Sequence, residues 1–221
     1  MCWSATADLA AGTAITAAGL VCVARARRAR DLPVAALPVI LGCHQLVEAA
    51  LWRSGGGCGP ATTAWAVIAL PLLAAWVPLA VLLAAGPGAA PSVRRRLLFP
   101  TAAGLATAAV LAYGLATRPV TAEIRGHVIG YGVSVPYAPL VVAGYLVATL
   151  GSLLLAGDRR LRVLGAAMAA GAALCALFWR LEFASTWCAF AAVASLLVLG
   201  WVRRGEDGPG HWFLAPRTKS R

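Results

Sequence analysis

The stretch GCHQLVEAALWR, residues 42 to 53, places a histidine and a glutamate four residues apart inside an otherwise apolar run. Residues four apart lie on the same face of an α-helix, so His44 and Glu48 share one face. Such a face does not belong in lipid, because a charged side chain at the centre of a membrane helix costs about 2.5–3.5 kcal/mol on insertion scales. The stretch therefore predicts a membrane helix whose polar face is turned toward other helices.

The composition of the whole chain supports an integral membrane protein. Hydrophobic residues make up 61% of the sequence, charged residues make up 12%, and the mean hydropathy is +0.80, which is far from the balance of a soluble domain. The chain divides into seven apolar runs, each close to the roughly 20 residues that a helix needs to span a bilayer. We expect these spans at about residues 5–24, 33–52, 61–85, 97–117, 137–156, 161–179 and 184–202.

The expected fold is all-α. The runs are continuous and lack the ten-residue alternation of a membrane β-barrel, and a helix satisfies its backbone hydrogen bonds within the segment. Residues 1–202 therefore form one seven-helix transmembrane bundle. Residues 203–221 are polar, glycine-containing and basic, which predicts a flexible cytoplasmic tail.

The arginines predict the orientation, because positive charge is retained on the cytoplasmic side of short loops. Fifteen of the 19 lysine and arginine residues follow the first, third, fifth or seventh run or lie in the tail. The other four are Arg53, Arg118, Arg125 and Arg180. This pattern places the N-terminus outside and the C-terminus in the cytoplasm. The net charge of +11 then reflects topology and contact with anionic membrane lipids, and we expect no binding of nucleic acid.

One outer loop, RPVTAEIRGHVIGYGVSVP at residues 118–136, differs from the others. It alternates β-branched and polar residues and has glycines near its middle, which predicts a short β-hairpin. In its first arm Thr121, Glu123, Arg125 and His127 point one way and the apolar residues point the other way. An isolated hairpin is marginally stable in water, so we expect it to lie on the outer mouth of the bundle as a lid, with either face inward.

His44 and Glu48 fall well inside the second run. Counting inward from Trp52 with a rise of ~1.5 Å per residue, Glu48 lies roughly 6 Å below the outer boundary and His44 roughly 12 Å below it. Other charged or titratable residues also fall at or near the outer side, which predicts an outward-facing polar pocket. These residues are Asp8, Arg53, Glu123, Arg125, His127, Arg180 and Glu182.

Three interpretations of this pocket remain open, and one of them is a metal-dependent enzyme. His44 and Glu48 then supply two ligands to a divalent metal such as zinc, and His127 or Cys2 supplies a third, which leaves an open position for water. In a catalytic site Glu48 acts as ligand or general base and His44 as ligand or acid/base. Arg180 stabilises an anionic group, and the substrate is a lipid or an extracytoplasmic small molecule.

The two other interpretations involve no chemistry. In the second, the pocket binds or transports a small molecule or lipid, with Glu48 and Arg180 recognising its polar part. Its lining then comprises Gln45, Trp52, Tyr145, Trp179 and Trp187. In the third, Glu48 pairs with Arg180 or Arg53 and the cluster only fixes helix packing.

Several familiar membrane functions are disfavoured by single residues. A retinal protein needs a buried lysine, and the only lysine is Lys219 in the tail. A transmembrane haem usually needs paired histidines, whereas His44 stands alone within the apolar runs. The six cysteines form no C-x-x-C motif, which argues against a thiol–disulfide exchanger. Cys2 and Cys58 both fall on the outer side, where a disulfide between them is a further hypothesis.

Three segments resemble a known group of proteins. The start MCWSATAD, the stretch HQLVEAALW at residues 44–52 and GHVIGY at residues 126–131 look like segments of small uncharacterised bacterial multi-pass proteins. The resemblance implies a location in the bacterial inner membrane and supplies no mechanism. The positions that it marks are Cys2, Ser4, His44, Gln45, Glu48 and His127. The chain differs in carrying Trp3 and Asp8 where phenylalanine and serine are expected.

Overall fold

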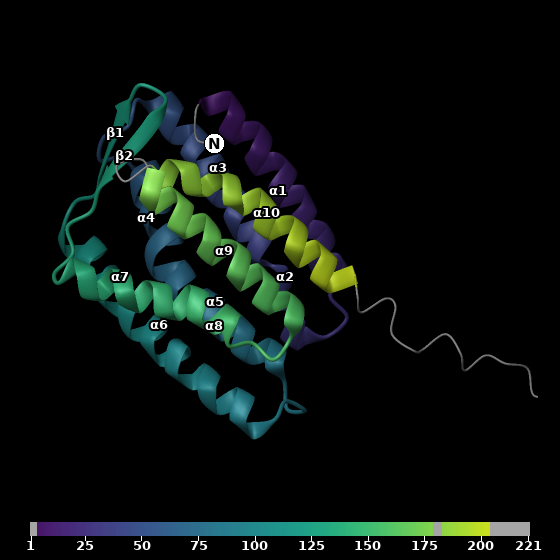
Figure 1. The fold of residues 1–221 in the computed structure, drawn as a ribbon. Coiled ribbons are helices and arrows are strands. Elements are labelled where there is room, and N and C mark those ends of the chain that lie inside the picture. Colours follow the sequence, from purple (N-terminus) through teal and green to yellow (C-terminus); the bar gives the residue numbers. More distant parts are fainter. Residues whose placement is uncertain (1–3, 179–182, 204–221) are drawn as a thin grey trace, which may run out of the picture.

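A computed structural model describes residues 4–178 and 183–203 of the chain (Figure 1). Helices account for most of this part, and its seven continuous helical stretches overlap the seven predicted apolar runs. The predicted all-α fold is therefore confirmed, with one two-stranded sheet added to it. The predicted tail from residue 204 onward lies outside the described residues.

Several of the stretches are built from more than one helical element. The turn η1 is a 3₁₀ turn, and η2 and η3 are π-helical turns that join the α-helices on either side. The helical elements are α1 (Ala5–Arg25), η1 (Ala29–Asp31), α2 (Leu32–Ala35), α3 (Leu37–Ser54), α4 (Pro60–Val67), η2 (Ile68–Leu72), α5 (Leu73–Ala85), α6 (Pro91–Thr117), α7 (Ala138–Leu146), η3 (Val147–Gly151), α8 (Ser152–Leu154), α9 (Arg159–Phe178) and α10 (Phe183–Arg203).

Five stretches of the described chain are long and apolar enough to cross a membrane. They are Ala5–Arg25, Ala29–Ser54, Pro60–Ala85, Pro91–Thr117 and Arg159–Leu177. Two shorter apolar helices, Ala138–Leu154 and Phe190–Arg203, accompany them. These lengths and compositions suggest a membrane protein.

Helix ends follow local sequence signals. Ser4 caps α1, because its hydroxyl accepts a hydrogen bond from the backbone N–H of Ala7 at 3.2 Å. The second stretch is divided at Ala36, and Pro38 stands in the first turn of α3, where its missing N–H is not needed. Pro71 lies within the π-helical turn η2. Gly55 ends α3 in the left-handed conformation with φ +77°.

Helices α1 and α3 pack against each other through small residues. A Cβ atom added at Gly19 would lie 2.5 Å from the backbone nitrogen of Val39, and one added at Gly42 would collide with Thr16. Glycine therefore lets the two backbones approach closely, as in many membrane helix pairs. The pairs Gly19–Val39 and Asp8–Trp52 make the two helices antiparallel. Asp8 in α1 thereby reaches the C-terminal part of α3.

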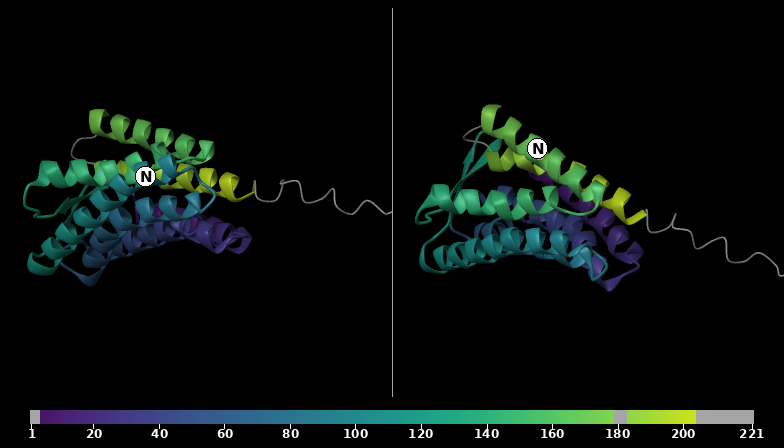
Figure 2. Two further views of the ribbon diagram at one scale, coloured as in Figure 1. Left: turned by 90° about the horizontal axis from the view of Figure 1, so that it is seen from below. Right: turned by 60° about the horizontal axis from the view of Figure 1, so that its bottom comes forward.

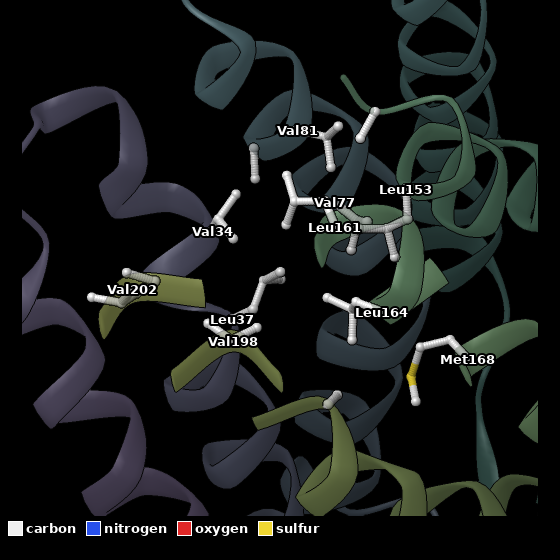
Figure 3. Close-up of a cluster of buried hydrophobic side chains, with 14 of the residues drawn as sticks. Val34, Leu37, Val77, Val81, Leu153, Leu161, Leu164, Met168, Val198 and Val202 are labelled. Carbon is white, nitrogen blue, oxygen red and sulfur yellow. The ribbon is translucent and has the colours of Figure 1, made fainter. Parts of the chain in front are cut away.

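Two apolar clusters lie toward opposite ends of the bundle. The larger one joins α2, α3, α5, α8, α9 and α10, and Figure 3 shows its branched and long side chains converging between these helices. The labelled members are Val34, Leu37, Val77, Val81, Leu153, Leu161, Leu164, Met168, Val198 and Val202. The smaller cluster forms under the hairpin and contains Leu51, Trp65, Ala66, Val120, Ala122 and Ile129.

The predicted hairpin is present, with β1 (Thr121–Arg125) antiparallel to β2 (Val128–Gly132) and Ile124 opposite Ile129. Its apolar face is the inward one, because Ala122 and Ile129 are buried whereas Glu123 and Arg125 are exposed. Figures 1 and 2 show the hairpin at one end of the side-by-side helices and the end of α10 at the other. We call these the hairpin end and the arginine-rich end. The arginine-rich end carries many of the arginines: Arg25, Arg30, Arg94, Arg95, Arg96, Arg159, Arg160, Arg162 and Arg203.

A turn of three glycines between α3 and α4 fastens the hairpin to the helices. Gly55, Gly56 and Gly57 all have positive φ, at +77°, +80° and +89°. The backbone of Gly57 exchanges two hydrogen bonds with Ala122 of β1, at 2.7 and 3.0 Å. A Cβ atom at Gly56 would lie 2.6 Å from the carbonyl oxygen of Ala122. The turn therefore needs glycine both for its conformation and for its approach to β1.

Substitutions in this turn separate the two requirements. Gly55→Ala meets only the cost of positive φ, because nothing lies within 4 Å of its added Cβ, and should destabilise the protein by about 1–2 kcal/mol. Gly56→Ala should cost more, because it also displaces β1. Gly59→Ala, at φ −87° in open space, is the control and should be nearly neutral. Thermal unfolding in detergent measures all three, and equal midpoints for Gly55→Ala and Gly56→Ala would contradict the contact with β1.

Candidate functional site

Three polar side chains are buried where α1 and α3 meet at the hairpin end. Asp8 and Glu48 are 0% exposed and Gln45 is 2% exposed. Burying a carboxylate is costly unless its oxygens receive hydrogen bonds, so the partners of these groups define the site. We call Asp8, His44, Gln45 and Glu48 the polar cluster.

Glu48 receives a hydrogen bond from the hairpin. The hydroxyl of Tyr131 in β2 donates to Oε1 of Glu48 at 2.9 Å. The ring of Tyr131 stacks on Trp65 of α4, with ring centroids 3.4 Å apart and an angle of 6° between the planes. Stacking holds the tyrosine ring in place, so its hydroxyl is positioned over the carboxylate. The hairpin and the polar cluster are thus directly connected.

Asp8 receives its hydrogen bond from an aromatic side chain as well. The indole Nε1 of Trp52, at the end of α3, donates to Oδ2 of Asp8 at 2.8 Å. The antiparallel packing of α1 on α3 brings these two residues together. The sequence analysis places both residues at the outer side, with Trp52 in the pocket lining and Asp8 among the charges around it, and the structure joins them by this hydrogen bond.

His44 lies one helical turn below Glu48 and beside Trp65. Their ring centroids are 5.5 Å apart, with 43° between the ring planes. Nε2 of His44 and Nε1 of Trp65 are both buried, and neither has a hydrogen-bond partner within the described part of the chain. Leaving two buried ring nitrogens without hydrogen bonds costs free energy. A polar ligand that bonds to them would recover this free energy, so the space beside His44 and Trp65 is a favourable place for it.

The polar face of the hairpin does not contribute to the site. Glu123 and Arg125 pair with each other, with Nε of Arg125 3.0 Å from the Glu123 carboxylate, and both side chains are exposed. Arg53 and His127 are exposed as well, the latter at the hairpin turn. These four residues do not join the polar cluster. The hairpin turns its apolar face inward, which leaves Glu123, Arg125 and His127 outside, and Arg53 is exposed at the end of α3.

The ligands expected for a metal site are not brought together in the described residues. These residues contain no group of three or more histidine, cysteine, aspartate or glutamate side chains that could hold a metal ion. His127, in particular, does not complete a group with His44 and Glu48. Cys58 is an exposed free thiol, and its predicted partner Cys2 lies outside the described residues.

The comparison with known families gives a clear result. A family described as "Family of unknown function (DUF6629)" matches residues 1–210, which is nearly the whole chain. The chain belongs to this family. The match confirms the predicted membership of a family of unknown function. No curated protein and no solved structure matches the DUF6629 chain.

The remaining predicted pocket residues of the DUF6629 chain fall in different places. The hydroxyl of Tyr145 in α7 donates to the carbonyl of Ala69 at 2.7 Å, so it serves the π-helical turn η2 rather than the polar cluster. Trp179 and Arg180 lie outside the described residues. Trp187 belongs to α10, but its side chain is outside what the structure describes.

Tyr131 is a residue of the candidate site that the sequence analysis of this DUF6629 chain does not single out. A signal for it exists, because Ile129, Tyr131 and Val133 alternate on one face of the second arm. A tyrosine on an apolar hairpin face carries a hydroxyl that needs a partner. The partner, Glu48, is 83 residues away in sequence.

Removing the Tyr131 hydroxyl tests the link between the lid and the polar cluster. Tyr131→Phe keeps the ring stacked on Trp65 but takes one hydrogen bond from buried Glu48, which should destabilise the protein by about 1–3 kcal/mol. Tyr113→Phe is the matched control, since Tyr113 is 69% exposed, and should leave the unfolding midpoint unchanged. Denaturation of the purified protein in detergent compares the two. Equal midpoints for both variants and the parent protein would show that the hydrogen bond contributes nothing.

Proposed function

We propose that this DUF6629 protein spans the bacterial cytoplasmic membrane seven times, with its N-terminus outside and its C-terminus in the cytoplasm. Five long apolar stretches, two shorter ones and the gathering of arginines at one end of the bundle support this topology. The hairpin end then faces the extracytoplasmic side.

At that side we propose a lid-covered binding site for a small extracytoplasmic molecule that carries an amine or ammonium group. Buried Asp8 and Glu48 supply negative charge in a region of low dielectric, where attraction to a cation is strong. The rings of Trp52, Trp65 and Tyr131 lie around the carboxylates, and aromatic faces attract ammonium groups. The unpartnered Nε2 of His44 can accept a further hydrogen bond from the ligand, and the indole N–H of Trp65 can donate one to an acceptor elsewhere on it.

The observation that carries this proposal is the hydrogen bond from Tyr131 to Glu48. It joins a movable type of element, a two-stranded hairpin, to a carboxylate that is otherwise sealed from solvent. When the hairpin lifts, Glu48 loses the tyrosine hydroxyl as a donor. A ligand ammonium group then donates to Glu48 in its place, so that closure of the lid and binding of the ligand compete for the same oxygen.

A second candidate function is a metal-dependent membrane enzyme that acts on a lipid or small molecule. The observation that favours it is the buried and unpartnered Nε2 of His44, one turn from Glu48. Imidazole nitrogen and carboxylate oxygen are both common zinc ligands. Here His44 and Glu48 would hold the metal together with a ligand from outside the described residues, such as Cys2.

Replacing the Glu48 carboxylate by an amide tests the binding proposal. Glu48→Gln keeps the volume and an oxygen that accepts from Tyr131, but it removes the charge. Affinity for small amine probes such as ethanolamine, choline and putrescine, measured by calorimetry on the full chain, should fall about tenfold or more. Glu123→Gln is the control, because its carboxylate is exposed on the outward hairpin face, and should leave affinity unchanged.

The same variants separate the alternatives. A lower unfolding midpoint of Glu48→Gln with unchanged amine affinity per folded molecule would support a purely structural cluster. Metal content measured by mass spectrometry on protein purified without chelators covers the second candidate. Near-stoichiometric zinc that disappears in both His44→Ala and Glu48→Gln would favour the metal-dependent enzyme over the amine site.

A further inference from the structure

A cavity of about 540 Å³ opens at the arginine-rich end, opposite the hairpin. Its wall combines the η1 turn, the end of α5, the start of α6, the loop before α9 and the end of α10. Apolar side chains form much of the wall, with Arg30 and Asp158 as its charged members. The apolar members used below are Val81, Val93, Leu161 and Trp201. Val81 and Leu161 also belong to the large apolar cluster of Figure 3, so the cavity continues directly from the core.

Arg30 lies in the cavity wall against Gly86. Gly86, which has φ +66°, leaves room for its guanidinium group, because a Cβ atom added there would collide with it. Nε of Arg30 is buried and has no hydrogen-bond partner within the described residues. Its ion pair with Asp31 is loose, at 3.9 Å. The guanidinium therefore lies over Gly86 with its buried Nε free to bind a ligand.

Other groups make the rim of the cavity positive. The guanidinium of Arg162 donates to the carbonyls of Ala156 and Gly157 at 3.2 and 3.3 Å, and that of Arg160 donates to the carbonyl of Gly200, next to Trp201. Helix α6 begins at Pro91 with no side-chain cap, so the positive end of its dipole lies at the wall.

Among the described residues that line the cavity, Asp158 is the acidic one, and its carboxylate is used at the start of α9. Oδ1 of Asp158 accepts hydrogen bonds from the backbone N–H groups of Arg160 and Leu161, at 2.7 and 3.4 Å. It therefore caps the start of α9, where a carboxylate offsets the helix dipole. With Asp31 beside Arg30 also counted, three guanidinium groups (Arg30, Arg160 and Arg162) and two carboxylates lie at the rim, so its charge remains positive.

We propose that this cavity binds an anionic phospholipid, with Arg30 contacting the phosphate and the first acyl carbons lying against Val81, Val93 and Trp201. A positive rim over an apolar wall matches an amphiphile with an anionic head, and Arg is well suited to phosphate. In the proposed orientation the cavity faces the cytoplasmic leaflet, which is rich in anionic lipid. The proposal uses this membrane orientation and is independent of the site under the hairpin.

Lipid binding to the full-length protein in detergent tests the proposal. The protein is titrated with phosphatidylglycerol or with phosphatidylcholine of the same acyl chains, and bound lipid is counted by native mass spectrometry. One phosphatidylglycerol should bind at least about tenfold more tightly than phosphatidylcholine, and Arg30→Gln should remove most of this preference. Arg27→Gln is the matched control in the same loop, since Arg27 is exposed and outside the cavity wall, and should retain it.

Two further arms distinguish a lipid bound in the cavity from diffuse surface charge and from a soluble phosphate. Ala89→Phe fills the cavity without changing charge and should also abolish the preference for phosphatidylglycerol. Arg30→Lys keeps a positive charge and should retain part of this preference. Both variants remain informative if Arg30→Gln does not fold. Equal losses in Arg27→Gln and Arg30→Gln would overturn the proposal in favour of diffuse surface charge. Binding of soluble glycerol phosphate with the affinity and Arg30 dependence of the lipid would overturn it in favour of a soluble phosphate.

Discussion

A buried carboxylate needs hydrogen bonds, and the hairpin end of this protein is organised around that need. Glu48 obtains a donor from Tyr131, and Tyr131 is in turn held by its stack on Trp65. The hairpin can present Tyr131 only because its apolar face lies inward and because Gly57 pairs with Ala122. One electrostatic requirement thus links the consecutive segments α3, glycine turn and α4 with the hairpin, which lies far from them in sequence.

The two ends of the bundle carry charged side chains of opposite sign, and both depend on small residues to place them. At the hairpin end, carboxylates are enclosed among aromatic rings, and at the arginine-rich end, guanidinium groups lie on backbone carbonyls around an open cavity. Small residues make both arrangements possible. Gly19 and Gly42 let α1 carry Asp8 up to Trp52, and Gly86 leaves space for Arg30. Close backbone approach is therefore as important to the polar sites as the polar residues themselves.

The sequence predicts most of the fold and only part of the site. Apolar runs and strand alternation are local patterns, and they identify the helices and the hairpin with nearly correct limits. The burial of Glu48 follows from the cost of charge in an apolar run. The partners of Glu48 and Asp8 depend on how distant segments pack, which no local pattern contains. Which face of the hairpin lies inward also depends on this packing. Because the apolar face lies inward, Tyr131 contacts the polar cluster and His127 is exposed away from it.

The pairing of Gly57 with Ala122 also bears on how the protein avoids unwanted association. A two-stranded sheet has two edges, and exposed edges invite pairing with strands of other molecules. Here the outer edge of β1 is partly occupied by the backbone of the glycine turn, and β2 lies against α10. The edge of β1 is therefore partly paired, and β2 is close to a helix. A hairpin that lifts from the bundle uncovers these edges, so prolonged opening carries a risk of aggregation that favours brief excursions and rapid closure.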